Sequence, residues 1–525
     1  MSAPGKTLPV ILAIAILFFP SPQTVSADLQ DDLSQGYSLL DQWRIAEADA
    51  YAASLRKKYG DSGDVYFLWG RVEFFKGNYR KAQEILQDVA DNQPLVKEFK
   101  NLVMNTHWAA SNFVFEESEH FRFAYVDGPD RILVHYAREV LEKSYQVLGK
   151  ILDYFPPEKI LVEFYPDHEP FSQISPLTYQ DIMTSGTVAI CKYKRIMLIS
   201  PGALIRGYNW MDTLSHEFTH YLLSSKSGNN VPLWLHEGIA KYLESRWRGD
   251  REHLDPLMKT VLASGLAEDY LVSLERMMPS LAKLKNAEEV QLAYAEVATM
   301  VDYMTALQGE SVLAKIVDDF AKGLPVDAVL KKRLGMGLDA FQKNWKIFVK
   351  EKKFATIPGL KHFKFRFRSN RSQPTRKEKD ESGRMGAIEA HAEDLARLGD
   401  ILKSRNYLEA ASVEYEKAIA ESQTISPILN NKLATTYLLR KEYAKAETLL
   451  KKNIASYPSF STTEVNLGEL YYLQGELETS LRHYERAVRL NPFNPYVHSR
   501  LIDIMNKLER DAEKDLQARL FSQIE

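Results

Sequence analysis

The chain has a single cysteine, Cys191, among its 525 residues. One thiol forms no disulfide within the chain, and zinc fingers that need several thiolates are excluded. A bound metal ion would therefore take His and carboxylate ligands. The chain also has no excess of charge of one sign, with 67 Lys and Arg residues against 70 Asp and Glu residues. This balance indicates no nucleic-acid partner.

Long apolar runs are scarce as well. The longest covers residues 8–19 (LPVILAIAILFF), followed by Pro20 and by a small-residue site at residues 25–27. About a dozen apolar residues are few for a bilayer span, so the pattern predicts a secretory signal peptide over residues 1–27. Asp28 follows where a lipoprotein would need Cys. We therefore expect export to the periplasm or the exterior of a bacterial cell, and membrane attachment only if the segment stays uncleaved.

The length of the chain predicts more than one domain. A chain of 525 residues exceeds a single ordinary core, and two to four domains are expected. The hydrophobic content of 45% and the charged content of 26% are typical of folded globular proteins.

An internal repeat of 34 residues marks the C-terminal third. Small residues at two fixed points would let paired helices approach closely, and proline would end the second helix. The positions Ala434, Tyr437, Ala446, Leu450 and Pro458 recur as Gly468, Tyr471, Ser480, Tyr484 and Pro492. These residues resemble tetratricopeptide repeats, which we expect over residues 391–525. The resemblance implies a helical solenoid that binds protein partners.

The same spacing occurs near the N-terminus. Gly36, Leu40 and Ala48 map onto Gly70, Phe74 and Ala82 at an offset of 34. Residues 28–97 are therefore predicted to form similar repeats. Two repeats bury little apolar surface alone, so we expect them to dock on the domain that follows.

Residues 98–355 show no repeat and carry a different pattern. Short segments with strand character come first, and the pattern is helical from Met211 onward. This order predicts an α+β domain. The expected strands are residues 121–125, 160–165, 186–190 and 196–199.

A basic stretch separates this region from the C-terminal repeats. It contains nine Lys and Arg residues between Lys361 and Arg384 and few large apolar residues. A solvated, flexible linker over residues 356–390 is the prediction. Contact with an anionic surface is the alternative, and export argues against DNA.

A pair of histidines four residues apart marks the chemistry. His216 and His220 lie on one face of a predicted helix, where their ring nitrogens suit one tetrahedral zinc ion. Glu217 points to the same space and is suited to accept a proton from a zinc-activated water molecule. The alternative is a pair of surface histidines without a metal.

A second predicted helix offers the third ligand. It follows Pro232 and begins Trp-Leu-His-Glu-Gly, so that His236 and Glu237 are both within reach, although only one of two adjacent residues faces the metal. HExxH followed by W-L-x-E-G-x-A-x-Y resembles the gluzincin zinc peptidases, in particular the peptidase MA-like domains. The resemblance implies a zincin-like fold and Glu237 as the third ligand, with water in the fourth position. By analogy with that fold, residues 186–190 would line the substrate cleft.

Some positions depart from the family pattern or have competing interpretations. Lys241 stands where thermolysin-like enzymes carry an acid that orients a His, so Asp212 or Glu244 would have to do this. Tyr294 is a candidate donor to the transition state, against the alternative of core packing. Cys191 is interpreted as a small buried hydrophobe.

Together these features predict an exported zinc-dependent metallopeptidase. One Zn²⁺ per chain would be held by His216, His220 and Glu237, with Glu217 as the general base. Substrates would be proteins or peptides, and the repeats would bind protein partners. One alternative is a non-catalytic exported scaffold that retains the zinc fold. Another is hydrolysis of a non-peptide amide.

Overall fold

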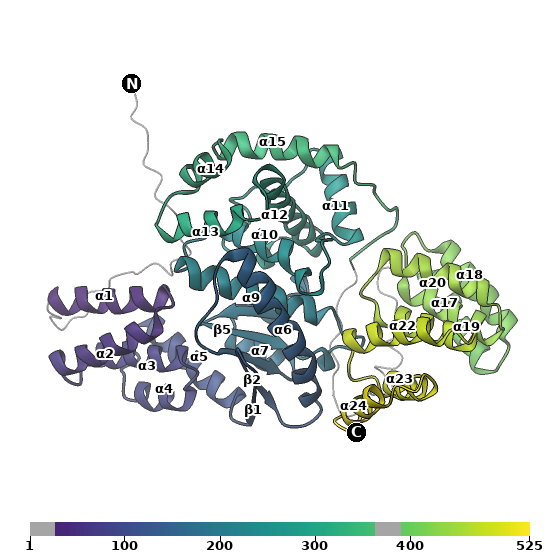
Figure 1. Ribbon diagram of the computed structural model, residues 1–525, viewed down its shortest axis with the longest axis horizontal. Helices are drawn as coiled ribbons and strands as arrows, with labels where there is room; N and C mark the ends of the chain where they lie inside the picture. Colours follow the sequence, from purple (N-terminus) through teal and green to yellow (C-terminus); the bar gives the residue numbers. More distant parts are fainter. Residues whose placement is uncertain (1–26, 363–389, 525) are drawn as a thin grey trace.

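The computed structural model describes residues 27–362 and 390–524. A central mixed α/β domain lies between two groups of helices, one from each end of the chain (Figure 1). The predicted signal segment before Ala27 and residues 363–389 of the predicted linker lie outside the described residues. In the part of the chain that the structure describes, no helix combines the length and the apolar character needed to cross a bilayer.

The N-terminal group consists of paired helices. Its close contacts explain the recurring small residues: a methyl group added at Gly36 would lie 2.5 Å from Leu68, and one added at Gly70 would lie 2.5 Å from Leu86. The repeat of small residues therefore marks helix crossings. The helices are α1 (Ala27–Asp41), α2 (Ile45–Tyr59), α3 (Gly63–Phe75), α4 (Tyr79–Leu86) and α5 (Pro94–Ala109).

A five-stranded sheet forms the first half of the central domain. The strand order is β1-β2-β3-β5-β4, with parallel pairing of β3 to β2 and β5 and antiparallel pairing at both edges. All five β5 residues are buried, which requires cover on both faces of the sheet. The strands are β1 (Phe113–Glu117), β2 (Phe121–Val126), β3 (Ile160–Tyr165), β4 (Ala189–Lys192) and β5 (Arg195–Ile199).

Two features of the sheet differ from the prediction. Strand β1 was missed because none of its residues is buried, so it lacks the apolar alternation of a half-buried strand. Strand β4 begins at Ala189 rather than at Gly186, because Gly186 ends helix α8 in a left-handed conformation (φ 73°). The helices beside the sheet are α6 (Arg131–Leu152), α7 (His168–Ile174) and α8 (Tyr179–Ser185).

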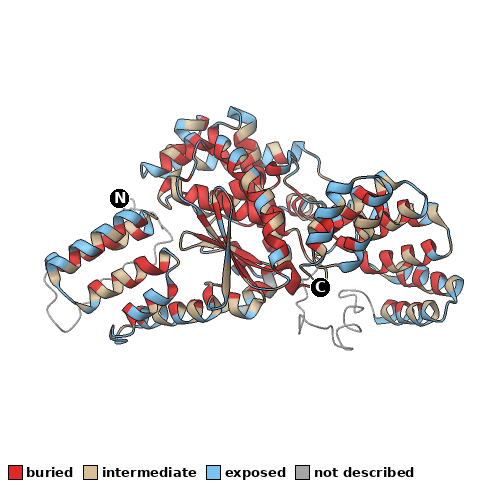
Figure 2. Ribbon diagram, turned by 60° about the horizontal axis from the view of Figure 1, so that its bottom comes forward, coloured by how far each residue is buried: buried red, intermediate tan, exposed pale blue. Residues whose placement is uncertain are grey.

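The second half of the central domain is helical. Helix α9 packs against α6, β4 and β5, and α10 packs against both α9 and α12. Figure 2 shows the buried residues gathered in the sheet and the helices around it. The helices are α9 (Trp210–Ser227), α10 (Leu233–Leu243), α11 (Pro256–Ala267), α12 (Ala287–Gln308), α13 (Val312–Ala321), α14 (Val326–Leu334) and α15 (Leu338–Glu351), with short 3-10 turns at Pro201–Ala203, Arg246–Arg248 and Leu281–Lys283.

The C-terminal group is a series of helix pairs. In two of these pairs an aromatic ring packs on a glycine 16 residues earlier: Tyr415 on Gly399 and Tyr484 on Gly468. The helices are α17 (Ala390–Ser404), α18 (Leu408–Glu421), α19 (Pro427–Leu439), α20 (Tyr443–Ser456), α21 (Ser461–Leu473), α22 (Leu477–Leu490), α23 (Pro495–Lys507) and α24 (Asp511–Phe521).

The first residues of the predicted linker make specific contacts. The backbone N–H of Ile357 donates to Thr260 (3.2 Å), and the carbonyl of Gly359 accepts from Ile425 N–H (2.7 Å). The hydroxyl of Tyr457 donates to the carbonyl of Lys361 (3.1 Å). These residues therefore connect α11 to the C-terminal helices.

The N-terminal helices share a buried ion pair with the sheet. Arg195 Nε on β5 lies 3.0 Å from Glu163 Oε2 on β3, and both side chains are only 1% exposed. The Tyr79 hydroxyl on α4 also donates to Glu163, and the Arg195 guanidinium stacks over Phe74 of α3 at 4.6 Å. Because a buried charge is costly without its partners, this cluster ties α3 and α4 to the sheet.

Helix α9 contacts both groups of helices, one at each end. Near its C-terminus, the Trp43 ring from the α1–α2 turn lies 5.5 Å from the Tyr221 ring. At its N-terminus, Trp210 Nε1 donates to the carbonyl of Arg489 at the end of α22 (2.7 Å). In the loop before α9, the Arg206 carbonyl accepts a hydrogen bond from Ser461 (2.8 Å).

Candidate metal centre

Helix α9 carries the two histidines and the glutamate of the HExxH motif. The four-residue spacing places His216 and His220 on adjacent turns of one face, with ring centroids 4.7 Å apart. Ligand atoms of these two residues and Glu217 all lie within 4.8 Å of one another. The exposed fractions of the three residues are 9%, 9% and 6%, so the group is largely closed to solvent.

Glu237 on α10 faces both imidazoles. Its Oε2 lies 3.5 Å from His216 Nε2 and 3.4 Å from His220 Nε2. This oxygen is buried and has no hydrogen-bond partner among the described residues. A tetrahedral zinc ion with bonds of about 2.0–2.1 Å separates its ligand atoms by about 3.3–3.4 Å. The carboxylate oxygen therefore lies from both Nε2 atoms at the spacing expected for ligands of one zinc ion.

Glu244, and not Asp212, is the acid that contacts Nδ1 of His216. Its Oε2 lies 3.2 Å from His216 Nδ1, and its other oxygen accepts a hydrogen bond from Lys241. Glu244 follows Glu237 by seven residues, two turns along the same face of the helix. Asp212 instead accepts hydrogen bonds from Trp247 Nε1 (2.8 Å) and from an arginine. Lys241 therefore serves as a counter-charge to Glu244.

His236 does not point to the place where His216, His220 and Glu237 converge. Its Nδ1 lies 2.6 Å from Nδ1 of His220, on the side of that ring away from Glu237, and its Nε2 lies 3.3 Å from Ser224 Oγ. The sequence left His236 as a competing ligand. The structure places it as a hydrogen-bond partner of His220.

The pKa values of Glu237 and His216 depend on the charged groups around them. Burial opposes the charge on Glu237, but His220 and His216 outweigh it and hold the pKa of this carboxyl far below its usual range. Burial likewise opposes protonation of His216, but the nearby carboxylates of Glu237 and Glu244 raise its pKa to about 10. The metal-free centre therefore holds a proton that a metal ion would displace.

Burial also shifts the pKa values of two other groups at the centre, Glu217 and His236. Burial raises the pKa of Glu217, in part against the attraction of His220 and His216. Burial, followed by the charge on His220, lowers the pKa of His236 to about 3. A raised pKa brings Glu217 closer to the range that suits a general base.

Tyr294 and Cys191 also border the centre. The Tyr294 ring on α12 lies 6.3 Å from the His216 ring, and burial together with Glu237 and Glu217 raises the pKa of its phenol well above 10. The backbone N–H of Cys191 on β4 faces the Glu217 carboxyl and partly offsets the rise in its pKa. Burial, followed by Glu217, raises the pKa of the Cys191 thiol, which argues against a nucleophilic role.

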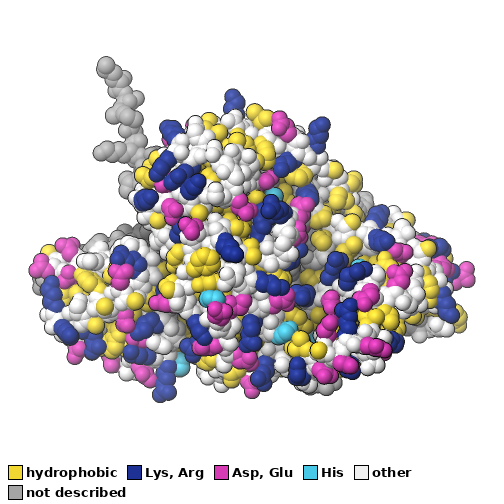
Figure 3. Space-filling view, viewed as in Figure 1, with side chains coloured by type: hydrophobic (Ala, Val, Ile, Leu, Met, Phe, Trp, Pro, Cys, Tyr) yellow, Lys and Arg dark blue, Asp and Glu magenta, His cyan; other side chains and the backbone are white. Residues whose placement is uncertain are grey.

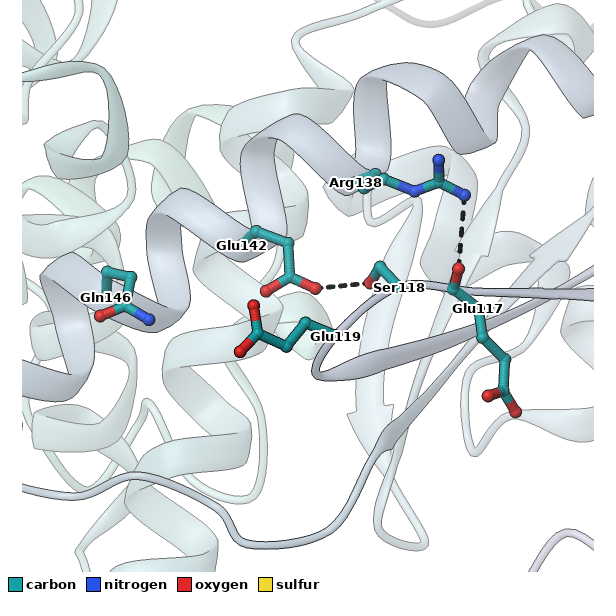
Figure 4. A pocket seen from close by; sticks show the side chains of 6 residues that line it. All are labelled: Glu117, Ser118, Glu119, Arg138, Glu142 and Gln146. Carbon is teal, nitrogen blue, oxygen red and sulfur yellow. Dashed lines mark hydrogen bonds between the residues drawn. The ribbon is translucent and has the colours of Figure 1, made fainter.

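A cavity of about 410 Å³ lies elsewhere, between the β1–β2 turn and α6 (Figure 4). Glu119, His120 and Glu142 group beside it and offer possible metal ligands. Glu142 already accepts hydrogen bonds from the Ser118 hydroxyl and from the backbone N–H of His120 (3.0 Å). Through these hydrogen bonds Glu142 holds the β1–β2 turn against α6, which accounts for the acidic group without a metal. The lining residues are Glu117, Ser118, Glu119, Arg138, Glu142 and Gln146.

Comparison with known protein families supports two parts of the chain. Residues 163–351 match the Peptidase MA superfamily, and residues 468–501 match the TPR repeat. The first match contains the whole centre, from α9 to α12, and the second covers the end of α21, α22 and the start of α23.

Two curated relatives overlap different parts of the chain. Stress-induced-phosphoprotein 1 of Caenorhabditis elegans is 28% identical over 117 residues, which are 22% of this chain and 34% of that protein. The uncharacterized protein YhcO of Bacillus subtilis (strain 168) is 22% identical over 248 residues, which are 42% of this chain and 67% of that protein. The chain thus spans about a third of the length of the first relative and two thirds of the second.

Two solved structures that are similar to part of the chain are tetratricopeptide repeat proteins. A thermophilic TPR protein of Thermus thermophilus is 23% identical, with 26% of this chain and 74% of that chain covered and a TM-score of 0.24. The first TPR of Spaghetti (RPAP3) bound to an HSP90 peptide is 22% identical, with 24% and 98% covered and a TM-score of 0.22.

The resemblances read from the two motifs are confirmed by the family matches. The chain contains a Peptidase MA superfamily domain over residues 163–351, followed by tetratricopeptide repeats.

Proposed function

We propose that this protein is a zinc-dependent metallopeptidase of the gluzincin type, with a zincin-like fold in the central domain. The observation that carries the proposal is the position of Glu237 Oε2, which is buried, unpartnered and within 3.5 Å of Nε2 of both His216 and His220. The three residues would hold one Zn²⁺. When bound there, zinc lowers the pKa of water and polarises a carbonyl group.

Glu217 acts as the general base. Its carboxylate takes a proton from the attacking water and passes it to the leaving amine. Burial raises its pKa, so it accepts and releases a proton more readily than an exposed glutamate at neutral pH. Its exclusion from solvent keeps the proton at the reacting atoms.

Tyr294 is the donor for the developing oxyanion in this proposal. Its phenol remains protonated at neutral pH because burial and the nearby Glu237 and Glu217 raise its pKa. A protonated phenol beside the scissile carbonyl stabilises negative charge that develops in the transition state.

Strand β4 supplies the surface for an extended substrate. Among the described residues it is an edge strand that pairs with β5, and its Cys191 N–H faces the Glu217 carboxyl. An unpaired strand edge binds an extended peptide through main-chain hydrogen bonds. A substrate strand along β4 would therefore run beside the base, which favours a peptide or an unfolded protein segment as substrate.

The tetratricopeptide repeats imply protein–protein interactions. Basic and acidic side chains are interspersed over the face shown in Figure 3, in keeping with protein rather than nucleic-acid partners.

Our proposal also includes export to the periplasm or the exterior of the cell. It further includes a division into a signal peptide (1–27), N-terminal repeats (28–97), a peptidase domain (98–355), a basic linker (356–390) and C-terminal repeats (391–525).

The low exposure of the centre favours one alternative, a non-catalytic scaffold that retains the zinc fold. The two functions are separated by zinc content and cleavage of denatured casein, measured on the full chain. We expect about one zinc per chain and cleavage that a chelator abolishes. Zinc without cleavage would support the scaffold, and protein without zinc would refute the proposed centre.

Two variants assign the roles within the centre. Glu217→Gln should retain zinc and lose casein cleavage by at least about 100-fold, because the amide accepts no proton. His220→Ala should lose the zinc itself, as measured by elemental analysis. Cleavage by Glu217→Gln at the wild-type rate would contradict the assignment of the base.

A further inference from the structure

His236 and His220 come from two different helices, and their rings lie edge to edge. Their ring centroids lie 4.7 Å apart with an angle of 23° between the planes, and the two Nδ1 atoms are 2.6 Å apart. The other nitrogen of His236 lies 3.3 Å from Ser224 Oγ. Because Ser224 follows His220 by one turn of α9, two residues of that helix fix the His236 ring at both nitrogens.

A hydrogen bond between two Nδ1 atoms requires a proton on one of them and a lone pair on the other. If His220 Nδ1 carries the proton, its Nε2 has a free lone pair directed to Glu237 Oε2 at 3.4 Å. If His236 Nδ1 carries it, a neutral His220 holds its own proton on Nε2 and has no lone pair for a metal. Which of the two Nδ1 atoms carries the shared proton thus decides whether His220 can be a ligand.

We propose that His236 is a positioning residue, whose Nδ1 accepts a hydrogen bond from His220 Nδ1–H and holds the lone pair of His220 Nε2 toward the metal. The inference rests on the proposed zinc centre and deepens it. It assigns to the residue next to Glu237 the orientation of the second histidine, as Glu244 orients the first.

The two orienting groups differ in chemistry. Glu244 is a carboxylate that accepts a hydrogen bond from Lys241 as well, so as an anion it can only accept from His216. A neutral imidazole can accept or donate. His236 can therefore donate to His220 in the metal-free protein and accept from it when the metal is bound, with Ser224 able to take either role.

Three variants of the full chain test this role. His236→Leu removes both nitrogens, His236→Asn keeps an acceptor near the position of Nδ1, and His253→Leu is the matched control. His253 is a half-buried histidine of the same domain that packs on Tyr242, with 5.1 Å between ring centroids. The Zn²⁺ dissociation constant is measured by competition with a chelator. The melting temperature of each metal-free variant is measured alongside it.

We expect His236→Leu to bind Zn²⁺ about 10- to 100-fold more weakly, as is typical when an orienting partner of a ligand is lost. His236→Asn should recover most of the affinity, and His253→Leu should retain all of it. In the ¹⁵N spectrum of the zinc-loaded protein, the hydrogen-bonded His220 Nδ1–H signal should be present in wild type and lost in His236→Leu.

Two results would overturn the inference while leaving the zinc centre intact. One is wild-type affinity in His236→Leu. The other is equal weakening in His236→Leu and His236→Asn that follows a fall in the melting temperature of both metal-free proteins, which would indicate a packing role only. Absence of Zn²⁺ from the wild-type protein would instead refute the centre, and this inference with it.

Discussion

Glu296 on α12 is a buried acid outside the metal centre. It is 1% exposed and accepts one hydrogen bond, from the backbone N–H of Val272 (2.9 Å). Burial raises the pKa of this carboxyl from 4.5 to about 8. The folded protein therefore keeps a proton on Glu296 at pH values where the unfolded chain has lost it.

This difference predicts a pH-dependent cost to stability. Between pH 4.5 and about 8 folding takes up a proton at Glu296. The contribution of Glu296 to the free energy of unfolding therefore falls as the pH rises. Glu296→Gln stays neutral and keeps an acceptor for Val272. The variant should be more stable than the metal-free wild type at pH 8, by up to about 1.4 kcal/mol for each pH unit above 4.5, and nearly equal to it below pH 4.5.

Glu289 on the same helix is the matched control. Burial opposes its charge, but Tyr270 and Arg276 hold its pKa below the usual value. Glu289→Gln should therefore destabilise the protein, and more so at pH 8 than at low pH, because the lost contribution is present only above the unfolded pKa. Thermal denaturation across pH compares the two variants. Parallel curves for wild type and Glu296→Gln would rule out a raised pKa at Glu296.

At the scale of elements, the position of Glu237 depends on how closely α10 approaches α12. Gly238, the next residue, lies at this contact. A methyl group added there would lie 2.6 Å from the backbone carbonyl oxygen of Val297. The glycine of the Trp-Leu-His-Glu-Gly segment thus allows α10 to pack closely on α12. This packing fixes the position of Glu237 relative to the two histidines.

Gly238→Ala should push α10 away from α12. We expect a loss of about 1–3 kcal/mol in the free energy of unfolding, typical of overpacking, together with weaker Zn²⁺ binding because Glu237 moves with its helix. Chemical denaturation and chelator competition measure the two effects. Loss of stability with unchanged zinc affinity would show that the ligand position does not depend on this contact.

The sequence was sufficient for the elements with strong periodicity. The HExxH helix and the second helix were predicted because their polar residues occur at helical spacing, and β3 because it is a short run of large apolar residues. Strand β1 carries no such signal, since its residues are only partly buried or exposed. Hydrophobic patterning detects a strand only where one face is covered.

The contacts of the centre were harder to predict than its residues. Glu244 and Asp212 were equivalent in the sequence, and only the packing of α10 on α9 places Glu244 against His216. His236 was considered as a ligand because it adjoins Glu237. Its position against His220 depends on the angle between α9 and α10, which no residue pattern encodes.

At the scale of the molecule, the loop before α9 fits closely against the C-terminal repeats. A methyl group added at Gly207 would lie 2.2 Å from the carbonyl oxygen of Leu490, at the end of α22. Gly207 also has a left-handed backbone (φ 66°). Both features exclude a larger residue at this contact.

Gly207→Ala should therefore loosen the C-terminal repeats from the central domain. We expect faster hydrogen exchange in α21 and α22 and a lower melting temperature than wild type. Gly249→Ala is the control, since Gly249 has a similar backbone (φ 77°) and open space around it. It should show only the backbone strain, about 1–2 kcal/mol. Equal exchange rates in the two variants would argue against docking through Gly207.

The contacts at both ends of α9 have a thermodynamic consequence. Trp43 reaches one end of the helix and Arg489 the other, while His216 and His220 lie between them. If a partner on either set of helices alters the affinity of the histidines for zinc by some factor, zinc must alter the affinity for that partner by the same factor. Titrating a partner against the apo and the zinc-loaded forms would therefore measure this coupling without any assay of cleavage.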